Sequence, residues 1–261
     1  MTPAPLNHAY GPHLSLHSHP YALSLLARLG HPSTRQPEVG LLCRRAFEFL
    51  FTQIVSQELP THHTRIPTRM TAIHPDQAFE GSVLVPDTKV VVVDVARAGI
   101  VPAQIFYERF NELLNPETVR QDHLFVSRTV NLHGQVTGAG VAASKIGGSL
   151  DGAFLFVPDP MGATGGSLLE ALAHYQRHDG GQPARIVCAH LIVTPEYVQR
   201  IHSIYPDIRI HALRLDRGFS SEAALASPPG TYPAEERGLN DHQYIVPGAG
   251  GLGEILNNAW V

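Results

Sequence analysis

The sequence predicts an α/β fold in which a parallel sheet is flanked by helices. Three runs dominated by apolar residues, Lys89 to Val95, Ala153 to Val157 and Ile186 to Val193, are typical of strands buried on both faces. Helical patterns separate these runs, over Gly99 to Leu114 and over Ser167 to about His178. Strands that alternate with helices form parallel sheets through right-handed crossovers, and ligands then bind at the carboxyl ends of the strands.

The remaining elements are predicted from similar signals. A helix is expected over Leu41 to Leu59, because its apolar residues recur on one face and Pro60 follows it. Another helix is expected after Thr194, which is a good N-cap, with Pro195 at its first position. The other expected elements are strands over Leu124 to Val130 and Ile208 to Leu215, and a glycine-rich hairpin or flexible loop over Gly134 to Gly148.

Composition narrows the class of protein. The chain has 261 residues, of which 43% are hydrophobic, and this is enough for one sizeable core. Its formal net charge is -4, so no basic excess indicates binding to nucleic acid. No apolar run approaches the length that spans a membrane, and no signal-peptide pattern is expected. Cys43 and Cys188 are expected to be buried thiols, which fits the reducing cytoplasm.

One domain is expected over residues 19–261, after a loose N-terminal arm over residues 1–18. The arm is rich in histidine, namely His8, His13, His17 and His19. Metal binding is one interpretation of these histidines, but the chain has no His-Glu-x-x-His or Cys-x-x-Cys motif, which favours a surface arm. Residues 218–236 contain Ser-Pro-Pro-Gly and are expected to form an inserted loop, for which a lid, a subunit contact and inert decoration all stay open.

The stretch from Asp159 to Ser167 is the most informative for function. It lies between a predicted strand and a predicted helix, and it reads Asp-Pro-Met-Gly-Ala-Thr-Gly-Gly-Ser. Glycines let the backbone approach an anion closely, and the N–H groups at the start of a helix favour a phosphate. An acid at the end of the strand suits sugar hydroxyls. The P-loop and dinucleotide-binding motifs are both absent, so the stretch predicts a site for a ribose phosphate.

The same stretch resembles the 5-phosphoribosyl pyrophosphate (PRPP) loop of uracil phosphoribosyltransferases. That loop reads Asp-Pro-Met-Leu-Ala-Thr-Gly-Gly-Ser, so Gly162 alone departs from it. The segment that begins at Arg97 resembles the family's Arg-Ala-Gly segment, and Arg128 resembles its second phosphate-binding arginine. Leu239 to Gly248 resembles the uracil-binding segment near the C-terminus. The similarity extends over nearly the whole chain, from about His19 to about Glu254.

The resemblance implies a fold, an activity and partners. The fold would be that of type I phosphoribosyltransferases, with a small C-terminal hood that binds the base. The activity would be transfer of ribose 5-phosphate from PRPP to uracil, which gives uridine monophosphate (UMP) and pyrophosphate in pyrimidine salvage. Mg²⁺ would accompany PRPP as a chelate rather than occupy a protein metal site. The protein would be a cytoplasmic homodimer or higher homo-oligomer that binds neither nucleic acid nor a membrane.

The resemblance also implies roles for particular residues. Asp159, which would bind the ribose hydroxyls, and Arg97, which would bind the pyrophosphate, are the expected catalytic residues. A helix-cap acid and a surface ion pair are their respective alternatives. The residues expected to bind PRPP are Arg97, Arg128, Asp159, Pro160, Met161, Gly162, Ala163, Thr164, Gly165, Gly166 and Ser167. The residues expected to bind uracil, mostly through main-chain atoms, are Tyr244, Ile245, Gly250, Gly251 and Leu252.

One departure from the family bears on the expected activity. Gly251 stands where the family has an aspartate that serves the PRPP side of the site, whereas Glu254 keeps an acid at the family's second aspartate. Asp94 is an unusual charge near Arg97, and it would either pair with that arginine or supply part of the lost charge. Two alternatives therefore stay open: a phosphoribosyltransferase for a different base, and a non-catalytic regulatory homologue that binds nucleotide or PRPP.

Overall fold

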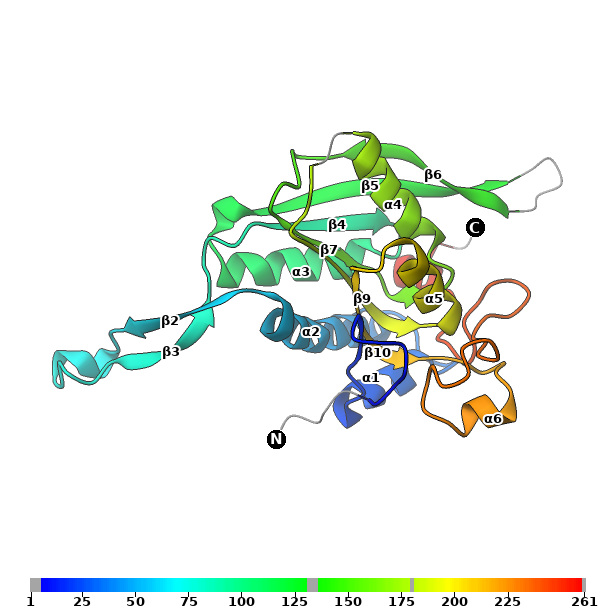
Figure 1. The fold of residues 1–261 in the computed structure, drawn as a ribbon, viewed down its shortest axis with the longest axis horizontal. Coiled ribbons are helices and arrows are strands. Elements are labelled where there is room, and N and C mark those ends of the chain that lie inside the picture. Colours follow the sequence, from blue (N-terminus) through cyan, green and yellow to red (C-terminus); the bar gives the residue numbers. More distant parts are fainter. Residues whose placement is uncertain (1–5, 131–135, 179–180, 260–261) are drawn as a thin grey trace.

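The structure, a computed structural model, describes residues 6–130, 136–178 and 181–259, without the side chains of residues 127–130 and 136–139. The strands of its main sheet are β1 (Leu14–Leu16), β4 (Val90–Ala96), β5 (Val119–Val130), β6 (Val136–Lys145), β7 (Phe154–Pro158), β8 (Met161–Gly162), β9 (Arg185–Val193) and β10 (Arg209–Leu215). Their order is β1-β10-β9-β7-β4-β5-β6, with β8 beside β9 (Figure 1). All pairs are parallel except β5 and β6.

Helices cover both faces of this sheet. Those on one face are α1 (Pro20–Leu29), α2 (Glu38–Glu58), α3 (Ile100–Leu113) and α7 (Leu252–Asn257), and those on the other are α4 (Gly166–Arg177) and α5 (Pro195–Ile204) (Figure 1). Along β4, Val90 and Val92 pack into the core on the first face, while Val91 and Val93 pack into the core on the second. Because both faces are covered, the strands are apolar at successive positions rather than at every second one.

The predicted fold class is confirmed, and most predicted elements are found within a few residues of their expected bounds. Thr194 caps α5 as expected, and its side chain accepts a hydrogen bond from the backbone N–H of Tyr197 at 3.1 Å. β5 is longer than predicted, because Val119 already pairs with the first residue of β4. Within the glycine-rich stretch, β6 pairs antiparallel with β5, as expected for a hairpin, and residues 131–135 lie outside the described part of the chain.

The prediction of a loose N-terminal arm is wrong for residues 14–16, which form β1. Leu14 and Leu16 are buried, and β1 adds a parallel strand beside β10. His17 follows it and hydrogen-bonds the ring of His211 at 3.0 Å. The ordered conformation of residues 14–17 depends on contacts with residues almost two hundred positions away, so no local sequence pattern could predict it. Among the described residues, no group of three or more histidine, cysteine, aspartate or glutamate side chains is placed so that it could hold a metal ion.

The inserted loop packs against the same N-terminal segment. Its short helix α6 (Glu222–Leu225) precedes Glu236, which is fully buried and accepts a hydrogen bond from Arg217 at 2.9 Å. The backbone N–H of Ala9 donates to the carbonyl of Pro229 at 2.7 Å. The inserted loop therefore contacts the rest of the molecule through these polar interactions.

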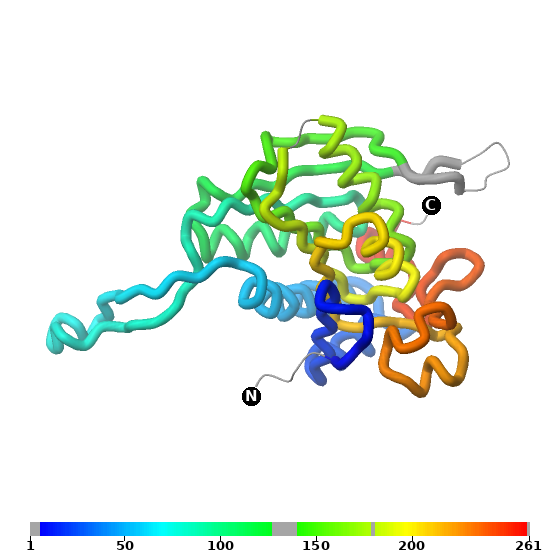
Figure 2. The backbone as a smooth tube through the Cα atoms, viewed as in Figure 1, coloured from blue at the N-terminus to red at the C-terminus, as the bar shows by residue number. Residues whose placement is uncertain are grey.

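A two-stranded arm was not predicted. It consists of β2 (Thr61–Ile66) and β3 (Phe79–Leu84), which pair antiparallel and extend away from the body of the molecule (Figure 2). Most of its side chains are exposed, so the alternation of buried and exposed residues that would reveal the strands is missing. Two short 3-10 helices, Arg69–Ala72 and Pro116–Thr118, complete the described elements. Among all the residues that the structure describes, no helix is both long and apolar enough to cross a bilayer.

Candidate active site

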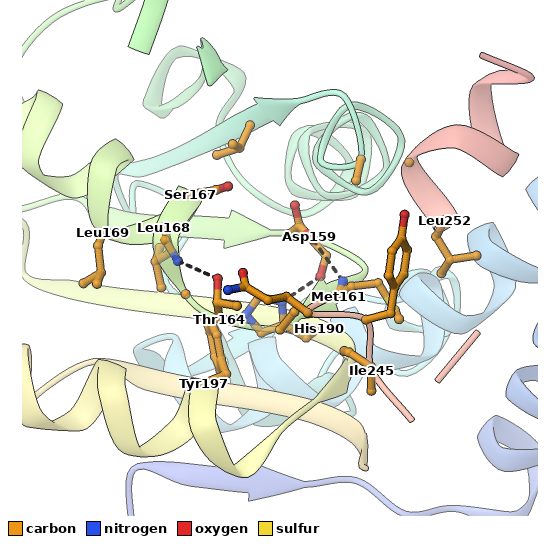
Figure 3. A pocket seen from close by; sticks show the side chains of 18 of the residues that line it. Asp159, Met161, Thr164, Ser167, Leu168, Leu169, His190, Tyr197, Ile245 and Leu252 are labelled. Carbon is orange, nitrogen blue, oxygen red and sulfur yellow. Dashed lines mark hydrogen bonds between the residues drawn. The ribbon is translucent and has the colours of Figure 1, made fainter. Parts of the chain in front are cut away.

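A cavity of about 820 Å³ opens at the carboxyl ends of the strands. Its walls come from the end of β4, the loop after β7 with the start of α4, residues of β9 and α5, and residues 243–254 near the C-terminus (Figure 3). The carboxyl edge of a parallel sheet is where ligands are expected to bind. The cavity therefore brings together the two stretches that the sequence marked for phosphate and for base.

The loop from Asp159 to the start of α4 forms the first of these walls. The short strand β8 lies within it and pairs with the end of β9, which fixes the middle of the loop to the sheet. Gly165 has a φ of +78°, a conformation that favours glycine, and α4 begins at the next residue. The residues from Ala163 to Ser167 line the cavity with small side chains and the first turn of a helix, an arrangement that suits a phosphate.

Asp159 is half-buried at the end of β7 and lines the cavity. Its Oδ1 accepts a hydrogen bond from the backbone N–H of Met161 at 2.9 Å. Burial raises the pKa of Asp159 to about 6, although the hydrogen bond from Met161 acts in the opposite direction. The carboxylate is therefore ionised above about pH 6 and can accept hydrogen bonds from ligand hydroxyls.

Two buried side chains beneath the loop were missed by the sequence analysis. His190 Nδ1 donates to the carbonyl of Asp159 at 2.7 Å, and the Tyr197 hydroxyl donates to His190 Nε2 at 2.6 Å. Burial lowers the pKa of His190 to about 4, so the ring is neutral, with one donor and one acceptor nitrogen. A histidine inside the apolar strand β9 is the one available sequence signal, and it does not reveal the partner.

Two residues of the next crossover hold the carbonyls of the same loop. The Thr194 hydroxyl donates to the carbonyl of Ala163 at 2.7 Å, and Arg200 Nη1 donates to the carbonyl of Thr164 at 3.1 Å. Arg200 also lines the cavity and brings a positive charge to the loop. It was not predicted, because it is one exposed arginine on α5 with no motif around it.

The glycine at position 162 has a structural explanation. A Cβ on Gly162 would lie 2.9 Å from Cγ1 of Val193 and 3.2 Å from two ring carbons of Tyr197. These contacts are closer than side chains normally make, so a leucine does not fit unless both Val193 and Tyr197 move. The departure from the family loop is thus coupled to the buried tyrosine on α5.

The base-side wall is held in place by acidic side chains from elsewhere in the chain. The Glu196 carboxylate accepts hydrogen bonds from the backbone N–H groups of Gly238, at 2.9 and 3.1 Å, and of Leu239, at 3.2 Å. Leu239 in turn forms an antiparallel bridge with Ile245. The first residues of the segment are therefore attached to α5, which also carries the phosphate-side residue Arg200.

A buried ion pair fixes the following turn. The Asp216 carboxylate accepts two hydrogen bonds from Arg214, at 2.6 and 2.7 Å, and one from the backbone N–H of Gly248, at 2.7 Å. Gly248 and Gly250 have φ values of +59° and +74°, which favour glycine at both positions. The turn that precedes the cavity wall is therefore specified both by its own glycines and by a distant carboxylate.

Most of the predicted site residues face one cavity. The predicted residues on its wall are Asp159, Met161, Ala163, Thr164, Gly165, Gly166, Ser167, Tyr244, Ile245, Gly250, Gly251 and Leu252. Pro160 and Gly162 belong to the loop but do not line the cavity, and the carbonyl of Pro160 accepts hydrogen bonds from β9 instead. Arg128 lies in β5, but its side chain is outside the described part of the structure.

Arg97 is exposed and does not line the cavity, although its neighbour Ala98 does. Its Nη1 donates to the carbonyl of Ala259 at 3.2 Å, just beyond α7. Asp94 does not pair with Arg97; its Oδ2 is hydrogen-bonded to Nδ1 of His123 on β5. The first of the two interpretations of Asp94 is therefore wrong.

The cavity offers single carboxylates rather than a group of metal ligands. The acidic residues on its wall are Asp159, Glu170 and Glu254. Mg²⁺ usually binds through one or two carboxylates together with substrate phosphates and water. The residues present therefore fit a Mg²⁺ ion that is held mainly by the phosphates of a ligand.

A family model for uracil phosphoribosyltransferase matches residues 16–231. The chain belongs to this family. The predicted family is confirmed, and with it the prediction of an enzyme of the phosphoribosyltransferase class is supported. The match ends before the segment from Leu239 to Glu254, so the assignment of the base-side wall depends on its motif and on its place in the cavity.

Individual proteins of the family match this chain at modest sequence identity and over less than half of its length. The uracil phosphoribosyltransferase of Exiguobacterium sp. is 36% identical over 100 residues, which cover 38% of this chain and 37% of that protein. That of Thermoanaerobacter sp. is 34% identical over 102 residues, 39% of this chain and 38% of that protein. The chain thus matches well under half the length of these relatives.

The solved structure of the AQ2163 protein from Aquifex aeolicus shares the fold over most of both chains. It superimposes with a TM-score of 0.69 at 21% identity and covers 95% of this chain and 99% of that one. At this identity the likeness establishes the fold alone.

Proposed function

We propose that the protein transfers ribose 5-phosphate from PRPP to uracil and forms UMP and pyrophosphate. The observation that carries this proposal is the single cavity whose walls are the Asp159–Ser167 loop and the Tyr244–Leu252 segment. The first wall suits a ribose phosphate, and the second offers main-chain groups to a planar base. Family membership supports the same reaction.

In the proposed complex each part of the cavity binds one part of the substrates. The backbone of Thr164 to Ser167 binds the 5′-phosphate, with Arg200 adding charge beside it. Asp159, ionised above about pH 6, accepts hydrogen bonds from the ribose hydroxyls. Ile245 and the turn at Gly250 present main-chain donors and acceptors to the edge of uracil. These contacts hold the two substrates together, so that proximity and electrostatics lower the barrier.

The chemical step exchanges one bond at the anomeric carbon for another. The bond between C1′ and the pyrophosphate oxygen breaks, and the pyrophosphate leaves with the electron pair. A ring nitrogen of uracil forms the new bond to C1′ and loses its proton to solvent. Arg97 and Arg128 are proposed to bind the leaving pyrophosphate, and for Arg97 this requires release from the carbonyl of Ala259.

Further parts of the proposal come from the family resemblance. These are Mg²⁺ bound with PRPP, a cytoplasmic homo-oligomer, and uracil rather than another base. The main alternative is transfer to a different base, for which the motives are Gly251, in place of the family's aspartate, and the inserted loop over residues 218–236.

A base panel tests the proposal directly. Pyrophosphate release from PRPP and Mg²⁺ is measured with uracil and, separately, with cytosine, adenine, guanine, hypoxanthine and xanthine. Release with uracil alone is expected. Release only with another base would establish the alternative, and no release, with PRPP or UMP still bound, would indicate a non-catalytic homologue.

A further inference from the structure

Gly251 is a glycine that its own backbone does not require. Its φ of -79° and ψ of 82° lie on the side of conformational space open to residues with a Cβ. Its neighbour Gly250 differs, because its φ of +74° favours glycine. The backbone conformation therefore does not explain the glycine at position 251.

The carboxylate of Glu254 lies in the space that a side chain at position 251 would need. A Cβ on Gly251 would lie 2.2 Å from Oε2 and 3.0 Å from Cδ of Glu254. Atoms that are not bonded do not approach so closely, so the carboxylate occupies the space in which a side chain at position 251 would begin. The glycine and this position of the carboxylate therefore depend on each other.

Helix α7 directs Glu254 toward the cavity. Leu252 and Leu256 are buried in the core and lie on one face of the helix, four residues apart. Glu254 is midway between them in sequence and so lies on the opposite face, where it lines the cavity together with Gly251. Within the described part of the chain its carboxylate forms no ion pair with a basic side chain.

An unpaired carboxylate weakens the binding of a polyanion to the same site, because like charges repel. PRPP carries several negative charges, so Glu254 opposes its binding in the ground state. Such a group lowers the barrier only if positive charge develops near it during the reaction. Loss of pyrophosphate leaves positive charge on C1′ and on the ring oxygen of the ribose, and this charge is present only in the transition state.

We propose that Glu254 faces the ribosyl group of PRPP from the base side and stabilises the positive charge that forms there, and that Gly251 is a glycine so that the carboxylate can take this position. The inference rests on the proposed transfer from PRPP. It assigns Asp159 and Glu254 to different tasks, since Asp159 binds hydroxyls in both ground and transition states, whereas Glu254 acts in the transition state.

Four enzymes test the pair: the wild type, Glu254→Gln, Gly251→Ala and the double variant. Glu254→Gln removes the charge and is expected to lower kcat at least about tenfold, as loss of one electrostatic contact does in other sites. KM for PRPP, and the Kd for PRPP measured by calorimetry, are expected to stay the same or fall, because repulsion is removed. Gly251→Ala is expected to reproduce the loss of kcat by displacing the carboxylate.

The double variant decides whether the two positions act through one group. Its kcat is expected to be no lower than that of the worse single variant, since the alanine has no charged carboxylate left to displace. Losses that multiply, or an unchanged kcat in Glu254→Gln, would overturn the inference while leaving the proposed function intact. A wild type that releases no pyrophosphate with any base would instead refute the proposed function, and the inference with it. Circular dichroism and melting temperature confirm that each variant folds.

Discussion

The two walls of the cavity are specified in different ways. The phosphate-side wall is one continuous stretch, from Asp159 to Ser167, formed by a strand end, a tight loop and a helix start. The base-side wall is fixed by contacts from distant residues, chiefly Glu196 and Asp216. The first wall consists of nine consecutive residues with a recognisable motif, although residues of β9 and α5 also bind its carbonyls, whereas the second wall is positioned mainly by distant carboxylates. This difference predicts that changes to the first wall affect turnover, and that changes behind the second affect stability and binding of the base.

The largest effect is expected for Asp159→Asn. The amide keeps the shape of the side chain but loses two acceptor sites for ribose hydroxyls, so kcat is expected to fall about a hundred- to a thousandfold. Pyrophosphate release at saturating PRPP measures this loss. Asp76→Asn, an exposed acid on the β2–β3 arm, is the matched control and is expected to leave the rate unchanged.

The same carboxyl group gives a pH dependence. Burial raises the pKa of Asp159 from 3.8 to about 6, so activity is expected to fall as the pH drops through about 6. The folded protein binds this proton more tightly than the unfolded chain, and the ionised carboxylate therefore destabilises the fold above that pH. Asp159→Asn, which carries no charge, is therefore expected to melt at a higher temperature than the wild type at pH 8. A lower melting temperature would show that the carboxylate is structural.

Asp216→Ala is expected to have the next largest effect. It leaves the half-buried Arg214 guanidinium and the N–H of Gly248 without their partner, which costs about 3 kcal/mol of unfolding free energy. Urea denaturation measures this cost, and KM for uracil is expected to rise more than KM for PRPP. Asp207→Ala, at an exposed turn, serves as the control. An equal rise in both KM values would remove the distinction between the two walls.

Gly162→Leu tests the coupling between the loop and α5. The added side chain meets Val193 and Tyr197, and such overpacking costs about 2 kcal/mol. The double variant Gly162→Leu with Tyr197→Ala opens space for the leucine, so its loss of stability is expected to be smaller than the sum of the single losses. Additive losses would contradict the packing explanation for this glycine.

Glu196→Gln is expected to have the smallest effect. The amide retains one acceptor for the N–H groups of Gly238 and Leu239, so about 1 kcal/mol of stability is lost. A modest rise in KM for uracil accompanies this loss, with kcat unchanged. Glu80→Gln on the exposed strand β3 is the control. A fall in kcat would place Glu196 in the chemistry rather than in support of the base-side wall.

The success of the sequence-based predictions also differs between the phosphate-side wall and the base-side wall. The strand before Asp159, the loop and the helix after it were all predicted, because apolar periodicity and turn residues act over a few positions. The segment from Leu239 to Leu252 was placed by resemblance alone, since the carboxylates of Glu196 and Asp216 that hold it are 42 and 32 residues away along the chain from the N–H groups they bind. The strand β1 and the pair of His190 and Tyr197 were missed because their order depends on tertiary contacts.

A crystal structure with UMP bound tests the central claim most directly, because it shows whether the two walls form one site. The account predicts the 5′-phosphate at the backbone of Thr164 to Ser167, the ribose hydroxyls at Asp159 and the uracil ring against Ile245 and the Gly250 turn. A nucleotide whose phosphate binds the loop while its base points away from residues 244–252 would contradict it.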